Sequence, residues 1–185
     1  RAPTAEAIEA AQAEADRLLE IFAALLRIAQ VESGTQRAGF TTGSLSASAE
    51  SVACVYGPAA EERGQVLVGE IAPGIAITGD PALLTQMLAN LVENAIRHGR
   101  AEGRVRLGVT AAGITVADDG PGIPEAEREK VFHRFHRLDA SRSTPGSGLG
   151  LALVRAVAEL HGIAIALEDA APGLRVRLTL PPDRP

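Results

Sequence analysis

The first thirty residues carry an apolar pattern in which hydrophobic positions recur alternately three and four residues apart. The pattern consists of Ile8, Ala11, Ala15, Leu18, Phe22, Leu25 and Ala29. This spacing is typical of a helix that packs along a seam in a coiled coil or bundle, and it predicts one long helix over residues 4–31. Further apolar residues widen the stripe on both sides: Leu19, Ile21, Leu26 and Ile28. A face this broad favours several neighbouring elements around the helix.

Two arrangements can supply those neighbours. The helix can pack on the rest of its own chain, or it can join a bundle with other molecules. We favour the intermolecular bundle, because the remaining chain has the elements of a complete domain without this helix. Ser33 and Gly34 are expected to end the helix, and residues 35–42 are expected to form a linker.

Short apolar runs separated by turn residues fill the rest of the chain. Strands are predicted over residues 66–71, 75–78, 105–110, 113–117, 163–167 and 174–180, and helices over 46–63, 81–98 and 148–160. Asp80 and Pro81 are typical of a helix start, Gly162 is typical of a helix end, and Gly57 with Pro58 interrupts the pattern of the first of the three helices. The mixture predicts an α+β fold over residues 43–185, a two-layer α/β sandwich in which helices cover one face of a mixed sheet.

Composition narrows the class of protein. A net charge of −5 over 185 residues argues against a nucleic-acid partner. The single cysteine, Cys54, excludes an internal disulfide and suggests a reducing, cytoplasmic compartment. No apolar run reaches the roughly 18 residues of a membrane span. Because the sequence starts at Arg1 without a methionine, we interpret it as a piece of a longer protein, for which membrane anchoring stays open.

Polar residues interrupt the apolar face of the predicted helix 81–98. Asn90 and Asn94 lie four residues apart and therefore share one side of the helix. Their amide oxygens are suitable ligands for a magnesium ion, although such residues can also bind neighbouring backbone. Arg97 lies close enough in sequence to reach a phosphate on the same ligand, and His98 adds a flat ring.

Two glycine clusters follow. Asp118, at the end of a predicted strand, precedes a tight turn through Gly120 and Gly122, and its carboxylate suits an exocyclic amino group such as that of adenine. An aspartate that only forms a turn is the alternative, and it is our interpretation of Asp119. The second cluster, residues 146–151, enters a helix, where backbone N–H groups form an anion site unless the glycines merely start the helix.

The segment between the clusters, residues 123–145, is too polar to be core throughout. We interpret it as a mobile lid that Phe132 and Phe135 anchor at one end. Arg137 and Arg142 are placed to meet phosphate oxygens, although each can also be an ordinary solvated arginine.

These four motifs occur in the order found in one family. Residues 90–95 (NLVENA), 118–123 (DDGPGI), 132–137 (FHRFHR) and 146–151 (GSGLGL) resemble the asparagine, first glycine, phenylalanine and second glycine boxes of sensor histidine kinases. The resemblance covers roughly residues 40–180 as the catalytic, ATP-binding domain. Residues 1–34 resemble the second helix of the dimerisation and phosphotransfer hairpin.

The resemblance implies a role for each motif residue. Asn94 would bind Mg²⁺ and Asn90 would assist it, Asp118 would contact adenine, and His98 would pack near the base. Phosphate contacts are implied for Arg97, Arg137 and Arg142, which with Asn90 form the expected catalytic set. The expected nucleotide-binding set is completed by Gly120, Gly122, Ile123, Gly146, Ser147, Gly148, Leu149 and Gly150.

The same resemblance implies the reaction and the partners. The chain would transfer the γ-phosphoryl group of ATP, leaving ADP, to a histidine of the hairpin helix that precedes it in the parent kinase. None of the four histidines, His98, His133, His136 and His161, looks like that acceptor. The phosphoryl group would then pass to the receiver domain of a response regulator, and the full-length protein would be a homodimer.

Other activities remain open. Related hydrolases place a glutamate four residues before the metal-binding asparagine, where this chain has Asn90, and Glu93 lies about 100° around the helix from Asn94. Hydrolysis is therefore expected to be slow. A non-catalytic nucleotide-binding or scaffolding module is the first alternative. A serine kinase of the anti-sigma type is the second, and the long first helix argues against it.

Overall fold

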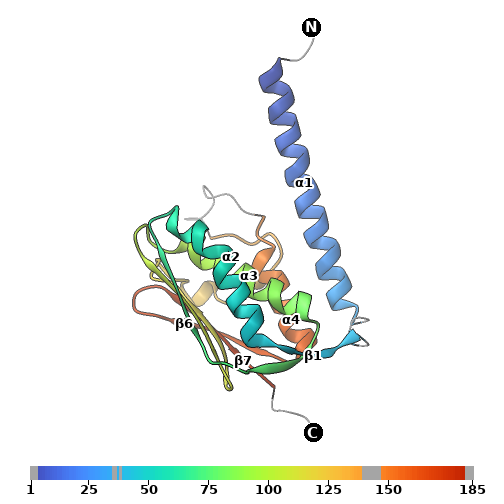
Figure 1. Ribbon diagram of the computed structural model, residues 1–185. Coiled ribbons are helices and arrows are strands. Elements are labelled where there is room, and N and C mark those ends of the chain that lie inside the picture. The colour runs from blue at the N-terminus through green and yellow to red at the C-terminus, as the bar shows by residue number, and fades with distance from the viewer. Residues whose placement is uncertain (1–3, 35–36, 38, 139–146, 182–185) are drawn as a thin grey trace.

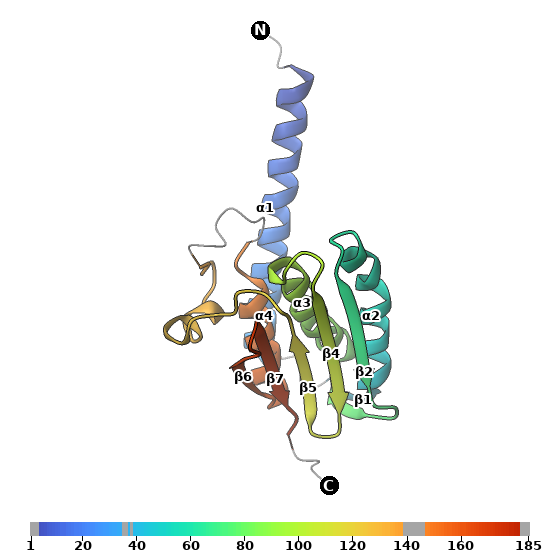
Figure 2. The same ribbon diagram turned by 90° about the vertical axis from the view of Figure 1, so that its left-hand side faces the viewer.

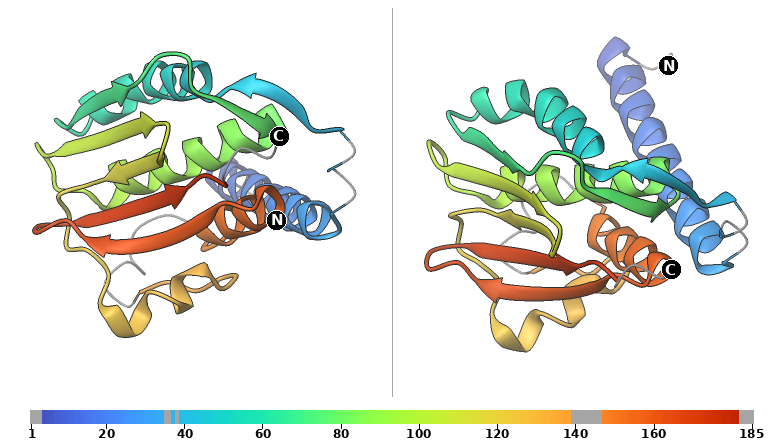
Figure 3. Two further views of the ribbon diagram at one scale, coloured as in Figure 1. Left: turned by 90° about the horizontal axis from the view of Figure 1, so that it is seen from below. Right: turned by 60° about the horizontal axis from the view of Figure 1, so that its bottom comes forward.

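A mixed sheet forms one layer of the structure and three helices form the other. The computed structural model describes residues 4–34, 37, 39–138 and 147–181. In spatial order the five strands are β2 (Val66–Ile71), β4 (Arg104–Thr110), β5 (Gly113–Ala117), β7 (Leu174–Thr179) and β6 (Ala164–Asp169). Helices α2 (Leu45–Glu61), α3 (Pro81–His98) and α4 (Gly150–His161) lie on one face of this sheet (Figures 2 and 3). The α+β sandwich predicted from the sequence is confirmed.

The strand pattern follows the alternation of side chains. Strands β4 and β5 form the predicted hairpin, β7 pairs antiparallel with both β5 and β6, and β2 runs parallel to β4. In β4 the buried residues Val105, Leu107 and Val109 alternate with more exposed ones. Since successive side chains in a strand point to opposite faces, the buried set faces the helices.

The helix ends follow their predicted capping residues. The Asp80 side chain accepts hydrogen bonds from the N–H groups of Ala82 and Leu83, and Pro81 occupies the first turn of α3. Helix α4 ends at Gly162, whose φ of 69° is the left-handed conformation that favours glycine. Apolar side chains from α3, α4 and the sheet form the core, among them Met87, Leu88, Leu91, Val157, Leu107, Ile114 and Leu178.

The helix predicted over residues 46–63 forms as α2, in spite of the break that Gly57 and Pro58 make in its pattern. The helix continues through Gly57 and Pro58 to Glu61. Pro58 lies in the last turn and is exposed, while Val52 and Ala60 are buried against the domain. Burial of the opposite side therefore holds the helix together across the residue that lacks an N–H.

A second, two-stranded sheet differs from the sequence expectation. Strand β3 (Ala76–Gly79) pairs antiparallel with β1 (Thr41–Ser44), a strand that the sequence did not predict. Ser46 ties this small sheet to the turn after β2, because its hydroxyl donates to the carbonyl of Ala72 and accepts from the N–H of Ile75. Strand β1 is thereby fixed to the domain.

The N-terminal helix, α1 (Ala5–Glu32), has two different apolar sides. On one side Ile28 and Val31, each 1% exposed, pack against the domain, where α1 contacts α4. On the other side Leu18, Leu19 and Phe22 are 58–65% exposed. The N-terminal part of α1 projects well beyond the sheet and its helices (Figures 1 and 2). No helix within the described residues has both the length and the apolarity needed to cross a membrane.

Candidate functional site

Helices α3 and α4 meet where the two predicted phosphate-side motifs lie. A Cβ atom added to Gly150, at the start of α4, would lie 3.9 Å from Oδ1 of Asn90. Asn90 is half-buried, and its Nδ2 atom is buried without a hydrogen-bond partner among the described residues. Asn94 follows one turn later on the same side of α3. Because a buried amide without a partner costs free energy, this one is suited to a ligand that brings an acceptor oxygen.

The N-cap residue of α4 has no side chain that can cap the helix. Leu149 occupies the N-cap position, is buried, and makes no side-chain cap. The first N–H groups of a helix have no partner within the helix, and the helix dipole favours negative charge there. The glycine-rich entry therefore leaves backbone donors beside Asn90 where a phosphate group would fit.

The C-terminal end of α3 carries the two cationic candidates. Arg97 forms an ion pair with Glu93, one turn earlier, so contact with a phosphate requires its guanidinium to leave or share that carboxylate. Glu93 is thus engaged with an arginine and is not positioned as a free base. Partial burial, together with the charges of Arg97, Arg137 and Arg63, lowers the pKa of His98, which keeps its ring neutral near pH 7.

Asp118 is a buried carboxylate at the end of β5. It is 9% exposed, and its Oδ1 accepts hydrogen bonds from the N–H groups of Gly120 at 2.8 Å and Leu174 at 3.4 Å. Burial raises the pKa of Asp118 above its ordinary value, and these two hydrogen bonds partly oppose the shift. The two N–H donors fix the orientation of the carboxylate, as recognition of an amino group requires.

Three glycines are required by close approaches of the backbone. A Cβ at Gly120 would collide with the carbonyl of His98, which brings the first glycine cluster against the end of α3. Gly122 and Gly148 have φ values of 72° and 69°. Gly148 also accepts a hydrogen bond at 3.0 Å from the N–H of Phe135, so the second cluster rests on the phenylalanine motif.

Side chains of α1 and α4 hold the described part of the predicted lid. It contains two short 3₁₀ helices, η2 (Glu125–Glu127) and η3 (Lys130–Phe132). Arg155 of α4 lies 5.7 Å from the ring centre of Phe132, and Arg134 forms an ion pair with Glu32 of α1. Phe135 is 56% exposed, so of the two predicted anchors only Phe132 packs on the domain.

Of the remaining lid and nucleotide-binding candidates, some lie within the described residues and others lie outside them. Arg137 lies close enough to His98 to affect its pKa. Ile123 packs against the core, and Ser147 is half-buried beside Gly148. Arg142 and Gly146 lie outside the described residues.

Sequence reasoning missed residues that fix the site from outside the motifs. Arg128 donates to the carbonyls of Ile123 and Leu167, which joins the end of the first glycine cluster to the edge strand β6. Gln65, next to β2, donates to the carbonyls of Ile96 in α3 and Arg100 in the turn after it. Neither residue belongs to a recognisable pattern, so no signal in the sequence singles it out.

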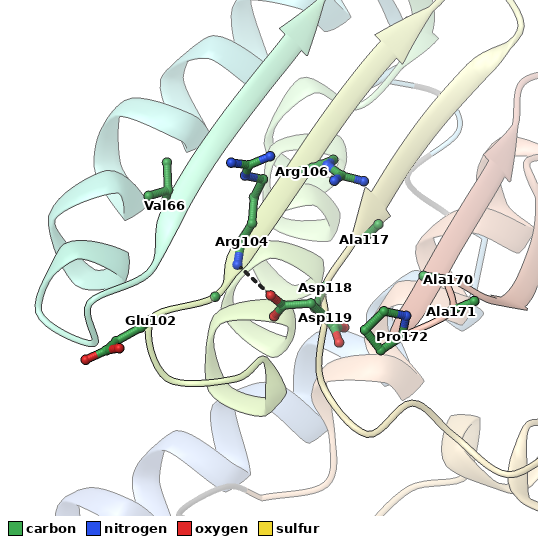
Figure 4. Close-up of a pocket in the computed structure, with 11 residues that line it drawn as sticks. Val66, Glu102, Arg104, Arg106, Ala117, Asp118, Asp119, Ala170, Ala171 and Pro172 are labelled. Carbon is green, nitrogen blue, oxygen red and sulfur yellow. Dashed lines mark hydrogen bonds between the residues drawn. The ribbon is translucent and has the colours of Figure 1, made fainter.

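A hollow of about 510 Å³ lies on the opposite face of the sheet (Figure 4). Arg104, Arg106 and Ala117 line it beside the Asp118–Asp119 step, with helices behind the strands. It holds carboxylates as well as guanidinium groups, and none of the predicted phosphate-binding residues lines it. We therefore place the candidate site on the helix face.

Comparison with known proteins identifies the family. The family model described as histidine kinase-, DNA gyrase B-, and HSP90-like ATPase matches residues 79–184. The chain belongs to this family of ATPases, and all four predicted boxes fall within the matched range.

Within the family the similarity is to sensor histidine kinases. The protein named signal transduction histidine-protein kinase/phosphatase MprB, from Mycobacterium sp. (strain KMS), is 47% identical over 105 residues, which make up 54% of this chain and 20% of that protein. The chain thus spans about a fifth of the length of the curated relatives that it matches.

Solved structures give the same result. A structure described as mycobacterial sensor histidine kinase MprB superposes with a TM-score of 0.67 at 29% identity, covering 77% of this chain and 97% of that one. Full-length ShkA in complex with AMPPNP gives a TM-score of 0.75 over 99% of this chain and 41% of that one. At 23% identity, this second match shows likeness of fold alone. The predicted ATP-binding catalytic domain of the histidine kinase type is confirmed.

Proposed function

We propose that this chain binds Mg-ATP between α3, the 118–123 loop and the start of α4, and transfers the γ-phosphoryl group to a histidine of the parent kinase. The imidazole nitrogen of the acceptor forms a bond to the γ-phosphorus while the bond to the bridging oxygen breaks. ADP leaves with that oxygen, and the acceptor ring loses its proton. The product histidine then supplies the receiver domain of a response regulator. We expect the reaction to take place in the cytoplasm.

One observation supports this assignment above the others. The buried Nδ2 of Asn90 lacks a partner among the described residues and lies where α4 begins without a capping side chain. Within the described residues both features are donors without an acceptor side chain, and a triphosphate supplies acceptor oxygens to both. The remaining roles follow the motif order: Asp118 binds the adenine amino group, His98 packs near the base, and Gly146, Ser147 and Gly148 enclose the phosphates.

Magnesium fits the side chains of α3. The amide oxygen of Asn94 is a suitable ligand, and a magnesium ion takes its other ligands from phosphates and water. Such an ion would neutralise phosphate charge during transfer. Arg97, Arg137 and Arg142 would add positive charge around the same phosphates.

Calorimetry with Mg-ATP provides the first test. We expect saturable binding to the wild-type chain, at least tenfold weaker binding for Asn94→Ala and after magnesium removal, and unchanged binding for the control Thr110→Ala at the far end of β4. Absence of binding to the wild-type chain would reject the nucleotide site and favour a scaffolding module.

Transfer is tested by mixing the chain with ATP and a hairpin domain that carries the acceptor histidine. We expect acid-labile, alkali-stable labelling of that domain, lost on replacement of its histidine. Labelling of a protein serine would favour a serine kinase, and release of free phosphate at a comparable rate would favour a hydrolase.

A further inference from the structure

The turn that joins α3 to β4, residues 99–103, is held from one side by a buried glutamine. Gln65 is 2% exposed, and its Nε2 donates to the carbonyls of Ile96 at 3.0 Å and Arg100 at 2.9 Å. Two carbonyl acceptors fix the orientation of the amide, because only its nitrogen can donate to both. Gln65 thus binds one carbonyl of the last turn of α3 and one carbonyl of the turn that follows it.

An aspartate holds the same turn from the other side. Oδ1 of Asp119 accepts from the N–H of Arg100 at 3.3 Å, and its Oδ2 accepts from the N–H of Arg104 at 3.0 Å. Gly103 is needed for this contact, because a Cβ there would lie 2.8 Å from Cγ of Asp119. Figure 4 shows the bond from Asp119 to Arg104 at the start of β4. Asp119 therefore joins two elements, which is more than the simple turn role expected from the sequence.

The 99–103 turn packs against Asp118. A Cβ added to Gly99 would lie 3.6 Å from Cβ of Asp118, an ordinary packing distance. Gly120, two residues after Asp118, approaches the carbonyl of His98 at the end of α3 too closely for any side chain. The end of α3, the turn and the 118–120 loop are therefore packed backbone against backbone, and a shift of the turn displaces the loop that orients the carboxylate.

We propose that Gln65 and Asp119 are positioning residues that hold the α3–β4 turn against Asp118 and thereby set the preference of the site for a base that donates an amino group. This inference rests on the proposed function. A carboxylate held in one place accepts from the amino group of adenine and is left facing the carbonyl oxygen of guanine, so discrimination depends on its fixed orientation. Loosening the turn lowers this discrimination more than it lowers phosphate binding, because the backbone donors at the start of α4 and the amide of Asn90, in the middle of α3, lie outside the turn.

The test compares Mg-ATP and Mg-GTP binding to three variants by calorimetry. Gln65→Met keeps the side-chain volume and removes both hydrogen bonds, and Asp119→Asn removes one carboxylate acceptor. Glu102→Gln, in the same turn with an exposed side chain, is the matched control. We expect the ratio of the GTP to the ATP dissociation constant to fall at least fivefold for Gln65→Met and about threefold for Asp119→Asn, and to stay unchanged for Glu102→Gln.

Hydrogen exchange gives a readout that needs no nucleotide. In both variants the amide of Gly120, which donates to Asp118, is expected to exchange faster than in the wild type. If the wild type prefers ATP but the variants keep its ratio of the two dissociation constants, or bind ATP and GTP equally more weakly, the positioning role is overturned. The proposed function is not affected by that result. A wild type that binds neither nucleotide overturns the proposed function and this inference together. If Gln65→Met does not fold, Asp119→Asn decides the outcome.

Discussion

At the scale of single residues, the candidate site contains groups that lower the stability of the domain when no nucleotide is bound. The buried carboxylate of Asp118 has a raised pKa, and Nδ2 of Asn90 is buried without a partner among the described residues. Such groups cost stability unless a ligand compensates them. Substitutions of these residues are therefore expected to affect the stability of the domain and its affinity for a nucleotide in different ways, which experiments can test.

Replacing Asp118 with asparagine is expected to stabilise the domain while it impairs binding. A raised pKa means that the folded chain holds the proton of Asp118 more tightly than the unfolded chain, so this group costs stability above the two pKa values. Asparagine removes the charge and keeps an oxygen that accepts from Gly120 and Leu174. We expect a melting temperature at or above that of the wild type and an ATP affinity at least about tenfold lower, roughly 1.4 kcal/mol. A clear fall in melting temperature would contradict this account.

His161 has a structural role that makes the stability depend on pH. Its Nε2 accepts from the N–H of Asp80 at 3.0 Å, its Nδ1 lies 2.7 Å from the carbonyl of Val157, and Phe40 stacks on the ring at 4.7 Å. These contacts require a neutral ring that is protonated on Nδ1. Burial lowers the pKa of His161, so between the folded and unfolded values the unfolded chain binds more protons. Stability is therefore fully present above about pH 6.5 and declines as the pH falls through the folded pKa.

Urea unfolding between pH 7.5 and about pH 5 measures this effect. Since His98 also has a lowered pKa, the comparison is made in a His98→Gln background. We expect His161→Gln to be less stable than this background at pH 7.5, because it loses the ring stack, and to lose less stability on acidification. Equal pH slopes for the two proteins would exclude His161 as the source.

At the scale of secondary structure elements, the sequence predicts what local signals control. Helix α3 lies between Asp80 and Gly99 as its caps require, and the β4–β5 hairpin follows from alternation around a short turn. The pairing of β1 with β3 depends on contacts distant in sequence, so it was not predictable.

The residues of the candidate site show the same difference between features with a local sequence signal and features that depend on distant contacts. Its motif residues stand out because glycines and asparagines are unusual within apolar segments. Gln65 and Arg128 do not stand out, because they act through contacts 31 to 39 residues away.

Packing and charge make unequal contributions where α1 meets the domain. Ile28 is buried against the domain, whereas the ion pair between Glu32 and Arg134 is exposed. We expect Ile28→Ala to cost about 2 kcal/mol or more and to increase hydrogen exchange in the C-terminal half of α1. Glu32→Gln is expected to cost less than about 1 kcal/mol. Glu20→Ala, at an exposed position of the same helix outside its apolar surface, is the control, with an expected effect within about 0.5 kcal/mol. An equal effect of Glu20→Ala and Ile28→Ala would contradict this account of where α1 packs on the domain.

At the scale of the whole molecule, the two arrangements considered for α1 are compatible. Its C-terminal half packs on α4 through one side, and the other side leaves an apolar surface exposed. The exposed surface comprises Ile8, Leu18, Leu19, Phe22 and Leu26. A single helix can therefore carry the domain on one side and join a bundle on the other.

Dimerisation through this exposed surface is the final prediction. Contiguous exposed apolar residues on a projecting helix are typical of an interaction surface, and the three- and four-residue spacing suits a helical bundle with a second copy of the chain. We expect concentration-dependent dimers in sedimentation experiments. Phe22→Glu should weaken the dimer at least tenfold, because the bundle would bury an unpaired charge. Ala13→Glu adds the same charge away from this surface and should leave the dimer intact. A wild-type chain that stays monomeric at every concentration, or equal weakening by both variants, would exclude this surface as the dimer contact and leave α1 as a helix that serves its own domain.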